Sequence, residues 1–167
     1  GAGGSIGSEL VKLIFRLKPE RLVLLEANEF ALYQIERQLT EPSDVIVVPV
    51  LGSVTDEALV RRTLAAYRID AVFHAAAHKH VPLVEANVLE GIRNNVRGTE
   101  VITRCAYEMN VRNFVLISTD KAVRPTNVMG ATKRWAELVV QHYGREADAH
   151  RTGQRFATVR FGNVLGS

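Results

Sequence analysis

The stretch Leu116-Ile-Ser-Thr-Asp-Lys-Ala-Val-Arg-Pro-Thr-Asn-Val-Met-Gly-Ala-Thr-Lys133 decides the fold that this sequence predicts. Its first residues complete an apolar strand, 114–117, and a hydroxyl, a carboxylate and an ammonium group follow at Thr119, Asp120 and Lys121. A proline then interrupts the chain, and a helix is expected to end the stretch. A strand end, a polar turn and a helix start, in this order, are typical of the edge of a ligand crevice in an α/β sheet.

The expected helix begins near Val128 and places Lys133 one turn after Met129, so these two side chains share a face. Extended short-chain dehydrogenases have Ser or Thr at the strand end and Tyr-x-x-x-Lys on the next helix. This chain has Thr119 and Lys133, but Met129 stands at the tyrosine position. The run 118–134 resembles a narrower family, the CapD-like, membrane-associated nucleotide-sugar 4,6-dehydratases of bacterial polysaccharide biosynthesis. In that family Thr-Asp-Lys carries chemistry and methionine can replace the tyrosine.

Composition restricts the class of protein. The 167 residues suffice for one domain, and 47% hydrophobic and 23% charged residues are ordinary for a globular chain. The net charge of +3 is too small to indicate nucleic acid, although it is compatible with an anionic diphosphate ligand. The single cysteine, Cys105, cannot form an internal disulfide and is expected in the core. We find neither a signal peptide nor an apolar run that would span a bilayer.

The predicted architecture is a Rossmann-type, doubly wound parallel α/β sheet with strand order 3-2-1-4-5-6. Strands are expected at 21–26, 45–50, 70–77 including the strand exit, 113–118 and 155–161. The strand at 21–26 is apolar and is therefore expected to be buried on both faces. Helices are expected at 8–16, at 29–39, from a cap at Thr55 or Asp56 to about 67, from between 82 and 87 to about 109, and from 128 past 142. A polar loop is expected at 147–154. The first helix is predicted to bury Ile6, Leu10, Leu13, Ile14 and Leu17.

The predicted domain, residues 1–167, is interpreted as a fragment. The chain begins inside its own glycine motif, so we expect the first strand, and most of a C-terminal sugar-binding part, to be missing. Unpaired strand edges promote misfolding and self-association. The fragment alone is therefore expected neither to fold well nor to turn over substrate.

The chain opens with the spacing Gly1-x-x-Gly4-x-x-Gly7 and runs directly into a helix. Glycines permit a tight turn close to a pyrophosphate, and the helix N-terminus supplies free N–H groups. Glu26 ends an apolar strand about 20 residues later, as a dinucleotide-binding fingerprint requires. Its carboxylate can accept hydrogen bonds from a ribose and would repel a 2′-phosphate, which favours NAD and leaves NADP as the second choice. The alternative is a solvent-facing loop glutamate.

Further cofactor contacts are expected at other strand ends. Three small residues after the 70–74 strand let a flat cofactor lie against the backbone. The family commonly has aspartate beside the adenine where this chain has Ser53, and serine can still form a hydrogen bond. The resemblance implies that Lys133 binds the nicotinamide ribose. The complete predicted cofactor site is Gly1, Gly4, Ser5, Ile6, Gly7, Glu26, Ser53, Val54, Ala75, Ala76, Ala77 and Lys133.

A histidine-rich loop permits two interpretations. His74, His78 and His80 fall within seven residues and could form a metal site. However, zinc sites need three or four convergent ligands, and neither a cysteine pair nor His-Glu-x-x-His accompanies them. We therefore predict no metal. The similar Lys-His-Val-Pro loop of the family binds the sugar diphosphate, so Lys79 and His80 are predicted substrate residues, together with Asn163.

Two adjacent asparagines, Asn94 and Asn95, lie inside an apolar helical pattern, where asparagine is unfavourable. One of them is expected to bind backbone near the active site, as a helix asparagine does across the superfamily. A solvated pair is the alternative.

The resemblance implies removal of hydride from C4 of UDP-N-acetylglucosamine or a close relative, loss of water across C5–C6, and return of hydride to C6. Three jobs then need protein groups: a C5 base, a C6 acid and a group at O4. Our hypothesis assigns Lys121 as the base, Asp120 as the acid and Thr119 as the O4 ligand. Met129 has no proton to transfer. The alternative is a structural ion pair between Asp120 and Lys121, although consecutive side chains at a strand end should point in different directions.

Two other functions stay open. A cofactor-sensing module without turnover would explain the missing tyrosine, but not Asp120 and Lys121. A nucleotide-sugar 4-epimerase shares the first step and needs neither residue. The expected partners are a UDP-sugar and further copies of the full-length protein, without nucleic acid. The expected location is the cytoplasmic side, with anchoring in the bacterial inner membrane through segments outside this chain.

Overall fold

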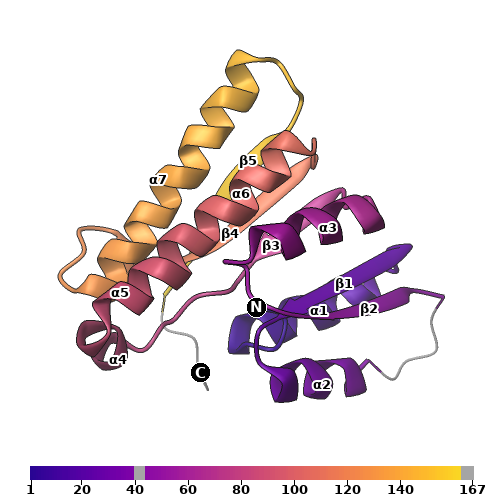
Figure 1. Cartoon of the computed structure of the whole chain (residues 1–167), viewed down its shortest axis with the longest axis horizontal. Helices are drawn as coiled ribbons and strands as arrows, with labels where there is room; N and C mark the ends of the chain where they lie inside the picture. Colours follow the sequence, from indigo (N-terminus) through magenta and orange to yellow (C-terminus); the bar gives the residue numbers. More distant parts are fainter. Residues whose placement is uncertain (40–43, 163–167) are drawn as a thin grey trace. The chain divides into compact units, whose positions relative to one another are not determined.

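The computed structural model describes residues 1–39 and 44–162 (Figure 1). The chain divides into two compact units, Gly1–Ser53 and Val54–Ser167. Each unit contains one parallel sheet, with strand order β1-β2 in the first and β3-β4-β5 in the second. These neighbours are the ones that the predicted strand order requires within each sheet, and the α/β class is confirmed. Within the described ranges, no helix is both long and apolar enough to cross a bilayer.

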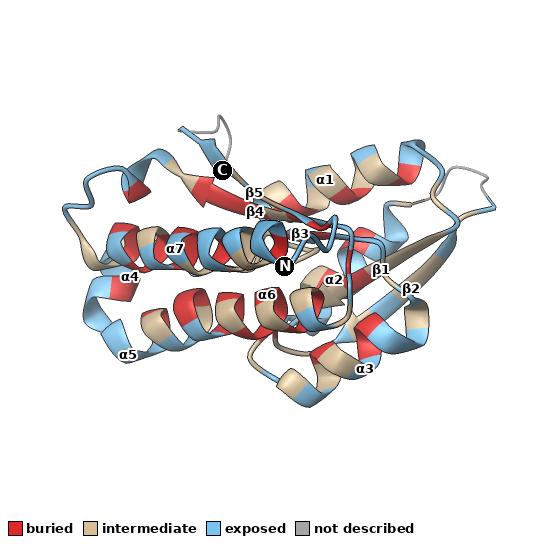
Figure 2. Cartoon of the chain, turned by 90° about the horizontal axis from the view of Figure 1, so that it is seen from above, coloured by how far each residue is buried: buried red, intermediate tan, exposed pale blue. Residues whose placement is uncertain are grey.

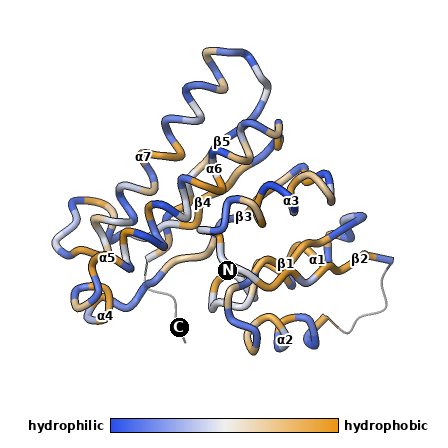
Figure 3. Tube along the Cα trace, in the orientation of Figure 1, coloured by the Kyte–Doolittle hydropathy of each residue, from blue (hydrophilic) through white to orange (hydrophobic). Residues whose placement is uncertain are grey.

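The first unit packs two helices and two strands around a small apolar core. Its elements are α1 (Ser5–Arg16), β1 (Arg21–Glu26), α2 (Glu29–Arg37) and β2 (Ile46–Leu51). The core consists of Val11, Leu24, Leu32 and Ile35, and hydrophobic residues concentrate in β1 and α1 (Figure 3). β1 was expected to be buried on both faces, but Leu24 is its only fully buried residue.

The stripe predicted for the first helix is wrong in part. The helix begins at Ser5, and its fully buried residues are Gly7, Val11 and Phe15. These residues are spaced by four and therefore lie on one face. Leu13 and Leu17 point away from the core and are 56% and 81% exposed.

The second unit places a three-stranded sheet against long helices. Its elements are α3 (Glu57–Tyr67), β3 (Ala71–His74), α4 (Val81–Ala86), α5 (Val88–Gly91), a π-helical segment (Ile92–Arg97), α6 (Gly98–Glu108), β4 (Asn113–Thr119), a 3-10 turn (Asp120–Ala122), α7 (Val128–Ala149) and β5 (Arg155–Phe161). β4 is central, with Phe114 and Leu116 fully buried, and Cys105 is a core residue as expected. Buried residues predominate along α6, whereas α7 carries buried residues on one face and exposed residues on the other (Figure 2).

The continuous helix expected up to about residue 109 is instead broken. Asn87 leaves the helical region at φ −136°, and its side-chain amide donates to the carbonyl oxygen of Leu83 at 2.9 Å. Asparagine forms such local bonds readily and so interrupts helices. The following π-helical segment carries both asparagines, Asn94 and Asn95. The loop predicted at 147–154 is also shorter, because α7 continues to Ala149.

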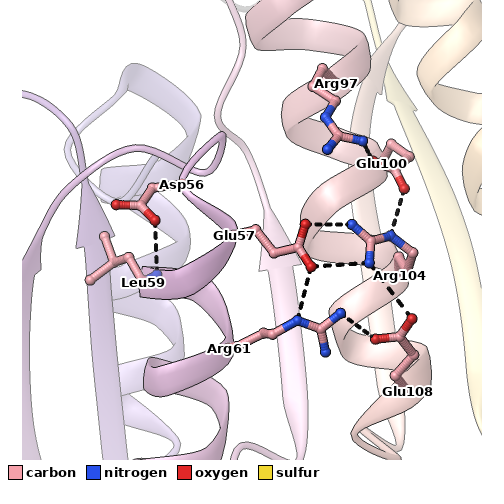
Figure 4. A network of polar contacts seen from close by, with 8 residues as sticks. All are labelled: Asp56, Glu57, Leu59, Arg61, Arg97, Glu100, Arg104 and Glu108. Atoms are coloured by element: carbon pink, nitrogen blue, oxygen red, sulfur yellow. Dashed lines mark hydrogen bonds and ion pairs between the residues drawn. The ribbon is translucent and has the colours of Figure 1, made fainter.

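An ion-pair network joins α3 to α6 (Figure 4). Arg104 donates two hydrogen bonds to the carboxylate of Glu57, at 3.1 and 2.7 Å between donor and acceptor atoms. It also donates to Glu100 at 2.7 Å. Arg61 bridges Glu57 to Glu108. The side chain of Asp56 accepts a hydrogen bond from the N–H of Leu59 and caps α3, which confirms one of the two residues expected there.

Glu57→Gln is expected to change how stability depends on pH. Hydrogen bonds from Arg104 and then Arg61 lower the pKa of Glu57 to about 2, from an ordinary value of 4.5. The stabilising contribution is therefore present above pH 4.5 and is lost as the pH falls toward 2. Thermal melts of the full-length protein across this window should fall less steeply for Glu57→Gln than for wild type. The exposed control Glu36→Gln should follow wild type; equal slopes for all three proteins would contradict the prediction.

Candidate functional site

The Thr119–Lys121 turn begins where β4 ends. The Thr119 hydroxyl donates to Oδ1 of Asp120 at 3.0 Å and accepts from the N–H of Lys121 at 3.4 Å. The bond from Thr119, and then the charge of Lys121, hold the pKa of Asp120 below its usual range. Asp120 is therefore a carboxylate at neutral pH, and it shares its polar surroundings with the two residues beside it.

Asp120 and Lys121 pair with each other, contrary to the expectation that they point in different directions. Nζ of Lys121 lies 3.6 Å from Oδ1 of Asp120. The side chain of Asp120 is 56% exposed and that of Lys121 is 42% exposed. Pairs this open to water contribute little to stability. Stability of the fold therefore does not explain well why these two residues stand at the end of the central strand.

Helix α7 presents Met129 and Lys133 on one buried face, as the sequence predicted. Asn127 caps the helix by accepting from the N–H of Gly130 at 2.7 Å. Nζ of Lys133 donates to the carbonyl oxygen of Ile117 at 2.7 Å, which ties the helix to the end of β4. Burial lowers the pKa of Lys133 to about 8, although the charge of Glu137 acts in the opposite direction. Met129 is 3% exposed and has no group that ionises.

Gly130 brings the first turn of α7 against the backbone of Lys121. A Cβ at this position would overlap the carbonyl oxygen of Lys121 and would press on the side chain of Asn127. Only a residue without a side chain permits this approach, so Gly130 helps to fix where Lys121 lies.

Gly130→Ala is expected to destabilise the full-length protein by about 1–3 kcal/mol, because backbone atoms must move to admit the methyl group. The same substitution at Gly144 on the same helix meets nothing closer than 3.5 Å. Gly144→Ala should therefore stabilise by about 0.5–1 kcal/mol through helix propensity. Urea unfolding measures both variants. A stabilising effect of Gly130→Ala would show that the close approach to Lys121 is not required.

Asn95 holds the histidine loop in place. Its Oδ1 accepts from the N–H of His78 at 2.8 Å, and its Nδ2 donates to the carbonyl oxygen of His78 at 3.0 Å. Nδ2 also donates to the hydroxyl of Thr132 on α7 at 3.0 Å. Of the two asparagines, Asn95 is thus the one that binds backbone, as expected, and it does so from a π-helical segment, a feature frequent at functional sites. The loop residues Lys79 and His80 that follow are exposed.

The three histidines take different environments. His74 is 2% exposed, and its Nε2 lies 2.9 Å from the hydroxyl of Thr99. Burial, and then the charge of Lys133, hold the pKa of His74 well below its usual value, so the ring is neutral. His78 instead faces Glu90 at 3.4 Å. Within residues 1–39 and 44–162, no three His, Cys, Asp or Glu side chains gather closely enough to hold a metal ion.

The glycine loop and the end of β1 lie together in the first unit. Oε2 of Glu26 accepts from the N–H of Gly3, and Oε1 accepts from the N–H of Asn28, both at 3.0 Å. A Cβ on Gly7 would overlap the carbonyl oxygen of Gly1, so the loop needs glycine there. Glu26 is consequently no solvated loop residue; its side chain is 12% exposed. A carboxylate has about four acceptor positions, so hydroxyl groups of a ribose remain acceptable partners.

The remaining predicted cofactor residues divide between the two units. Ser5 and Ile6 begin α1, and Ser53 ends the first unit. In the second unit, Val54 is buried against Gly98, and Ala75, Ala76 and Ala77 are half-buried after β3. Asn163 lies outside the described residues.

Sequence reasoning missed Glu137, which is fully buried on α7. It accepts from Ser118 on β4 and Arg160 on β5, the strands that border the site. One signal was present in the sequence: Glu137 follows Lys133 by four residues and therefore shares the face that packs on the sheet. A charged residue in a buried helical row is rarely present without partners.

Comparisons with known proteins show the family to which this chain belongs. The sequence profile of a family described as "Polysaccharide biosynthesis protein" matches residues 1–167. The capsular polysaccharide biosynthesis protein CapD of Staphylococcus aureus is 46% identical over 169 residues, covering 100% of this chain and 28% of that protein. A UDP-N-acetylglucosamine 4,6-dehydratase (inverting) of Campylobacter jejuni is 32% identical, covering 100% of this chain and 48% of that protein.

A solved structure shares the fold. The dTDP-glucose 4,6-dehydratase DesIV of Streptomyces venezuelae, a double mutant with NAD bound, has a TM-score of 0.78 at 23% identity and is matched over 95% of this chain and 53% of that one. The present chain thus spans less than half the length of the two curated relatives.

Proposed function

Since this chain belongs to the polysaccharide biosynthesis protein family, we propose that the full-length protein is a nucleotide-sugar 4,6-dehydratase. The single observation that carries the proposal is the exposed Thr119–Lys121 turn at the end of β4. The buried Lys133, on the helix that follows the turn, binds the end of the same strand. An acid and an amine that contribute little to stability, at the end of the strand to which the buried Lys133 binds, fit a site built for proton transfer.

The residues fit NAD as the cofactor. The glycine loop is held by Glu26, and the N-terminus of α1 follows without a side-chain cap among the described residues. Such a helix start suits a pyrophosphate, and Glu26 suits a ribose hydroxyl better than a 2′-phosphate. When bound, NAD would accept hydride from C4 of the sugar and give it back at C6. Lys133 would donate to the nicotinamide ribose.

The reacting groups then have separate tasks. The Thr119 hydroxyl would hold O4, and Lys121 would take the proton from C5 once a ketone at C4 has made that proton acidic. Asp120 would protonate the leaving hydroxyl at C6, so that water departs and a C5–C6 double bond forms. The same lysine would return its proton to C5 at the end. The net change is the loss of one water from the sugar.

Asp120 must be protonated to act as the acid, and the substrate has to raise its pKa. Its pKa lies below the usual range while water surrounds it. A sugar that covers the turn would remove this water, and desolvation favours the protonated carboxyl. Met129 cannot accept the O4 proton. In this proposal a water or another polar group takes that proton.

We further propose a UDP-sugar, UDP-N-acetylglucosamine in the first instance, as the substrate, which Lys79, His80 and Asn163 would contact. The C. jejuni relative named for this substrate, identical at 32% of positions, supports the choice. Self-association of the full-length protein, and its attachment to the cytoplasmic face of the inner membrane, belong to the same proposal.

Incubation of the full-length protein with UDP-N-acetylglucosamine tests the function. Mass spectrometry should detect a product lighter by one water. A product of unchanged mass with inverted C4 would indicate an epimerase. Binding of NAD without any product would indicate a cofactor-sensing module. Either of these two results would contradict the proposal.

A further inference from the structure

A carboxylate with three cationic or hydroxyl partners lies beneath the proposed site. Glu137 is 0% exposed, and Oε1 accepts from the Ser118 hydroxyl at 2.7 Å and from Nε of Arg160 at 2.8 Å. Oε2 accepts from Nη2 of Arg160 at 2.7 Å and from Nη1 of Arg134 at 3.0 Å. Arg160 therefore binds the carboxylate through two parallel bonds, the strongest geometry available to this pair.

These bonds connect three elements at the point where the reactive turn begins. Ser118 is on β4, Arg160 is on β5 and Glu137 is on α7. One turn earlier on α7, Lys133 donates to the carbonyl oxygen of Ile117. Two successive turns of one helix thus hold two successive residues of β4, immediately before Thr119. The placement of the turn follows from both bonds, since the strand cannot slide along the helix without breaking them.

The charges of the cluster also act on Lys133. Burial alone would raise the pKa of Glu137, but the hydrogen bonds from Arg160, Ser118 and Arg134 outweigh it and lower the pKa to about 2. The group is therefore anionic throughout the physiological range, and its charge favours the protonated form of Lys133. Among the described residues, Arg134 and Arg160 are the charged groups bonded to Glu137, and their positive charges are expected to weaken its effect on Lys133. His74 on β3, whose pKa is lowered by burial and then by the charge of Lys133, is neutral.

A ligand-binding role for the cluster itself is disfavoured. A hollow of about 450 Å³ adjoins it between α7 and β5, lined in part by Glu137, Phe156 and Arg160. None of Thr119, Asp120, Lys121 and Lys133 lines this hollow. The carboxylate has no exposed surface, and the guanidinium of Arg160 is already engaged by it.

We propose that Glu137 is a positioning residue that fixes the end of β4 against α7 and keeps Lys133 charged. The inference rests on the proposed function for the role of Lys133 towards the cofactor. The contacts of Glu137 and the protonation state of Lys133 do not depend on that function.

Two substitutions should move Lys133 in opposite directions. Glu137→Gln keeps the shape and removes the negative charge, so Lys133 should lose its proton at lower pH. Arg160→Gln removes a positive charge that neutralises Glu137 and repels Lys133, so Lys133 should lose its proton at higher pH. We expect each shift to be about half a pH unit or more, which is about threefold in the neutral fraction. A general loss of structure would not produce shifts of opposite sign.

Competitive acylation of the full-length protein with a small reagent, followed by peptide mass spectrometry, measures these shifts without cofactor or substrate. The wild-type midpoint for Lys133 is expected at about pH 8. Glu146→Gln, a change at a half-buried position near the end of the same helix, should leave the midpoint unchanged, and the other lysines serve as internal standards. If Glu137→Gln fails to fold, the upward shift of the Lys133 midpoint in Arg160→Gln still tests the inference.

An unchanged midpoint in Glu137→Gln, or a downward shift in Arg160→Gln, would overturn the inference. The alkaline limb of the kcat–pH profile should move in the same direction as the labelling midpoint. Shifted labelling in a protein that neither binds NAD nor dehydrates a sugar would contradict the proposed function and leave the role of Glu137 standing.

Discussion

Replacing Lys121 with alanine in the full-length protein is expected to lower kcat by about 10²- to 10⁴-fold, the usual contribution of a positioned base. Exchange of the C5 hydrogen of the sugar with deuterated solvent should disappear at the same time. The reason is specific: Lys121 is the one group of the turn that can accept this proton, since Asp120 is assigned to the C6 hydroxyl. Nuclear magnetic resonance of the sugar in deuterated buffer measures the exchange.

Lys121→Arg is the matched control. Arginine keeps the positive charge and can still pair with Asp120, which lies 3.6 Å from the lysine nitrogen. A guanidinium does not release its proton at neutral pH, so this variant should be as inactive as the alanine variant. Substantial activity in Lys121→Arg would mean that the lysine contributes only charge, and wild-type exchange in Lys121→Ala would remove it from the base role.

Asp120→Asn is expected to lower kcat to a similar extent, about 10²- to 10⁴-fold, by a different route. Asparagine can replace the hydrogen bond that Oδ1 of Asp120 accepts from Thr119, but it has no acidic proton for the C6 hydroxyl. Exchange at C5 should therefore persist while formation of the lighter product stops. The two variants together separate proton removal from water loss.

Asp120→Glu keeps the carboxyl group and moves it by one methylene. It should retain more activity than Asp120→Asn, because the acidic proton is preserved. If Asp120→Asn instead lost exchange at C5 and Lys121→Ala kept it, the two assigned roles would have to be reversed. Equal, near-normal turnover in both would leave only the exposed ion pair as their role.

The fold was largely predictable because buried strands and amphipathic helices have distinct periods. β5 was placed correctly, and β4 differs from the prediction by one residue. The cap of α3 also followed from local chemistry, as Asp56 shows by accepting a hydrogen bond from the N–H of Leu59. Such features depend on neighbouring residues alone.

Errors arose where distant contacts decide. The apolar residues of α1 surround much of the helix, so periodicity alone could not select the row through Val11 and Phe15. The break at Asn87 depends on one side chain choosing the carbonyl of Leu83.

The site was predicted by residue type better than by geometry. Lys133 and Met129 share a buried face, as their spacing requires. The cluster at Glu137 depends on how β4, β5 and α7 meet. No local sequence pattern encodes that meeting, because its partners lie up to 23 residues apart in the chain.

The fate of deuterium placed at C4 of UDP-N-acetylglucosamine tests the central claim most directly. The full-length protein should release a product lighter by one water, with the label at C6. Label retained at C4 of an epimer, or unchanged sugar in the presence of bound NAD, would contradict the account.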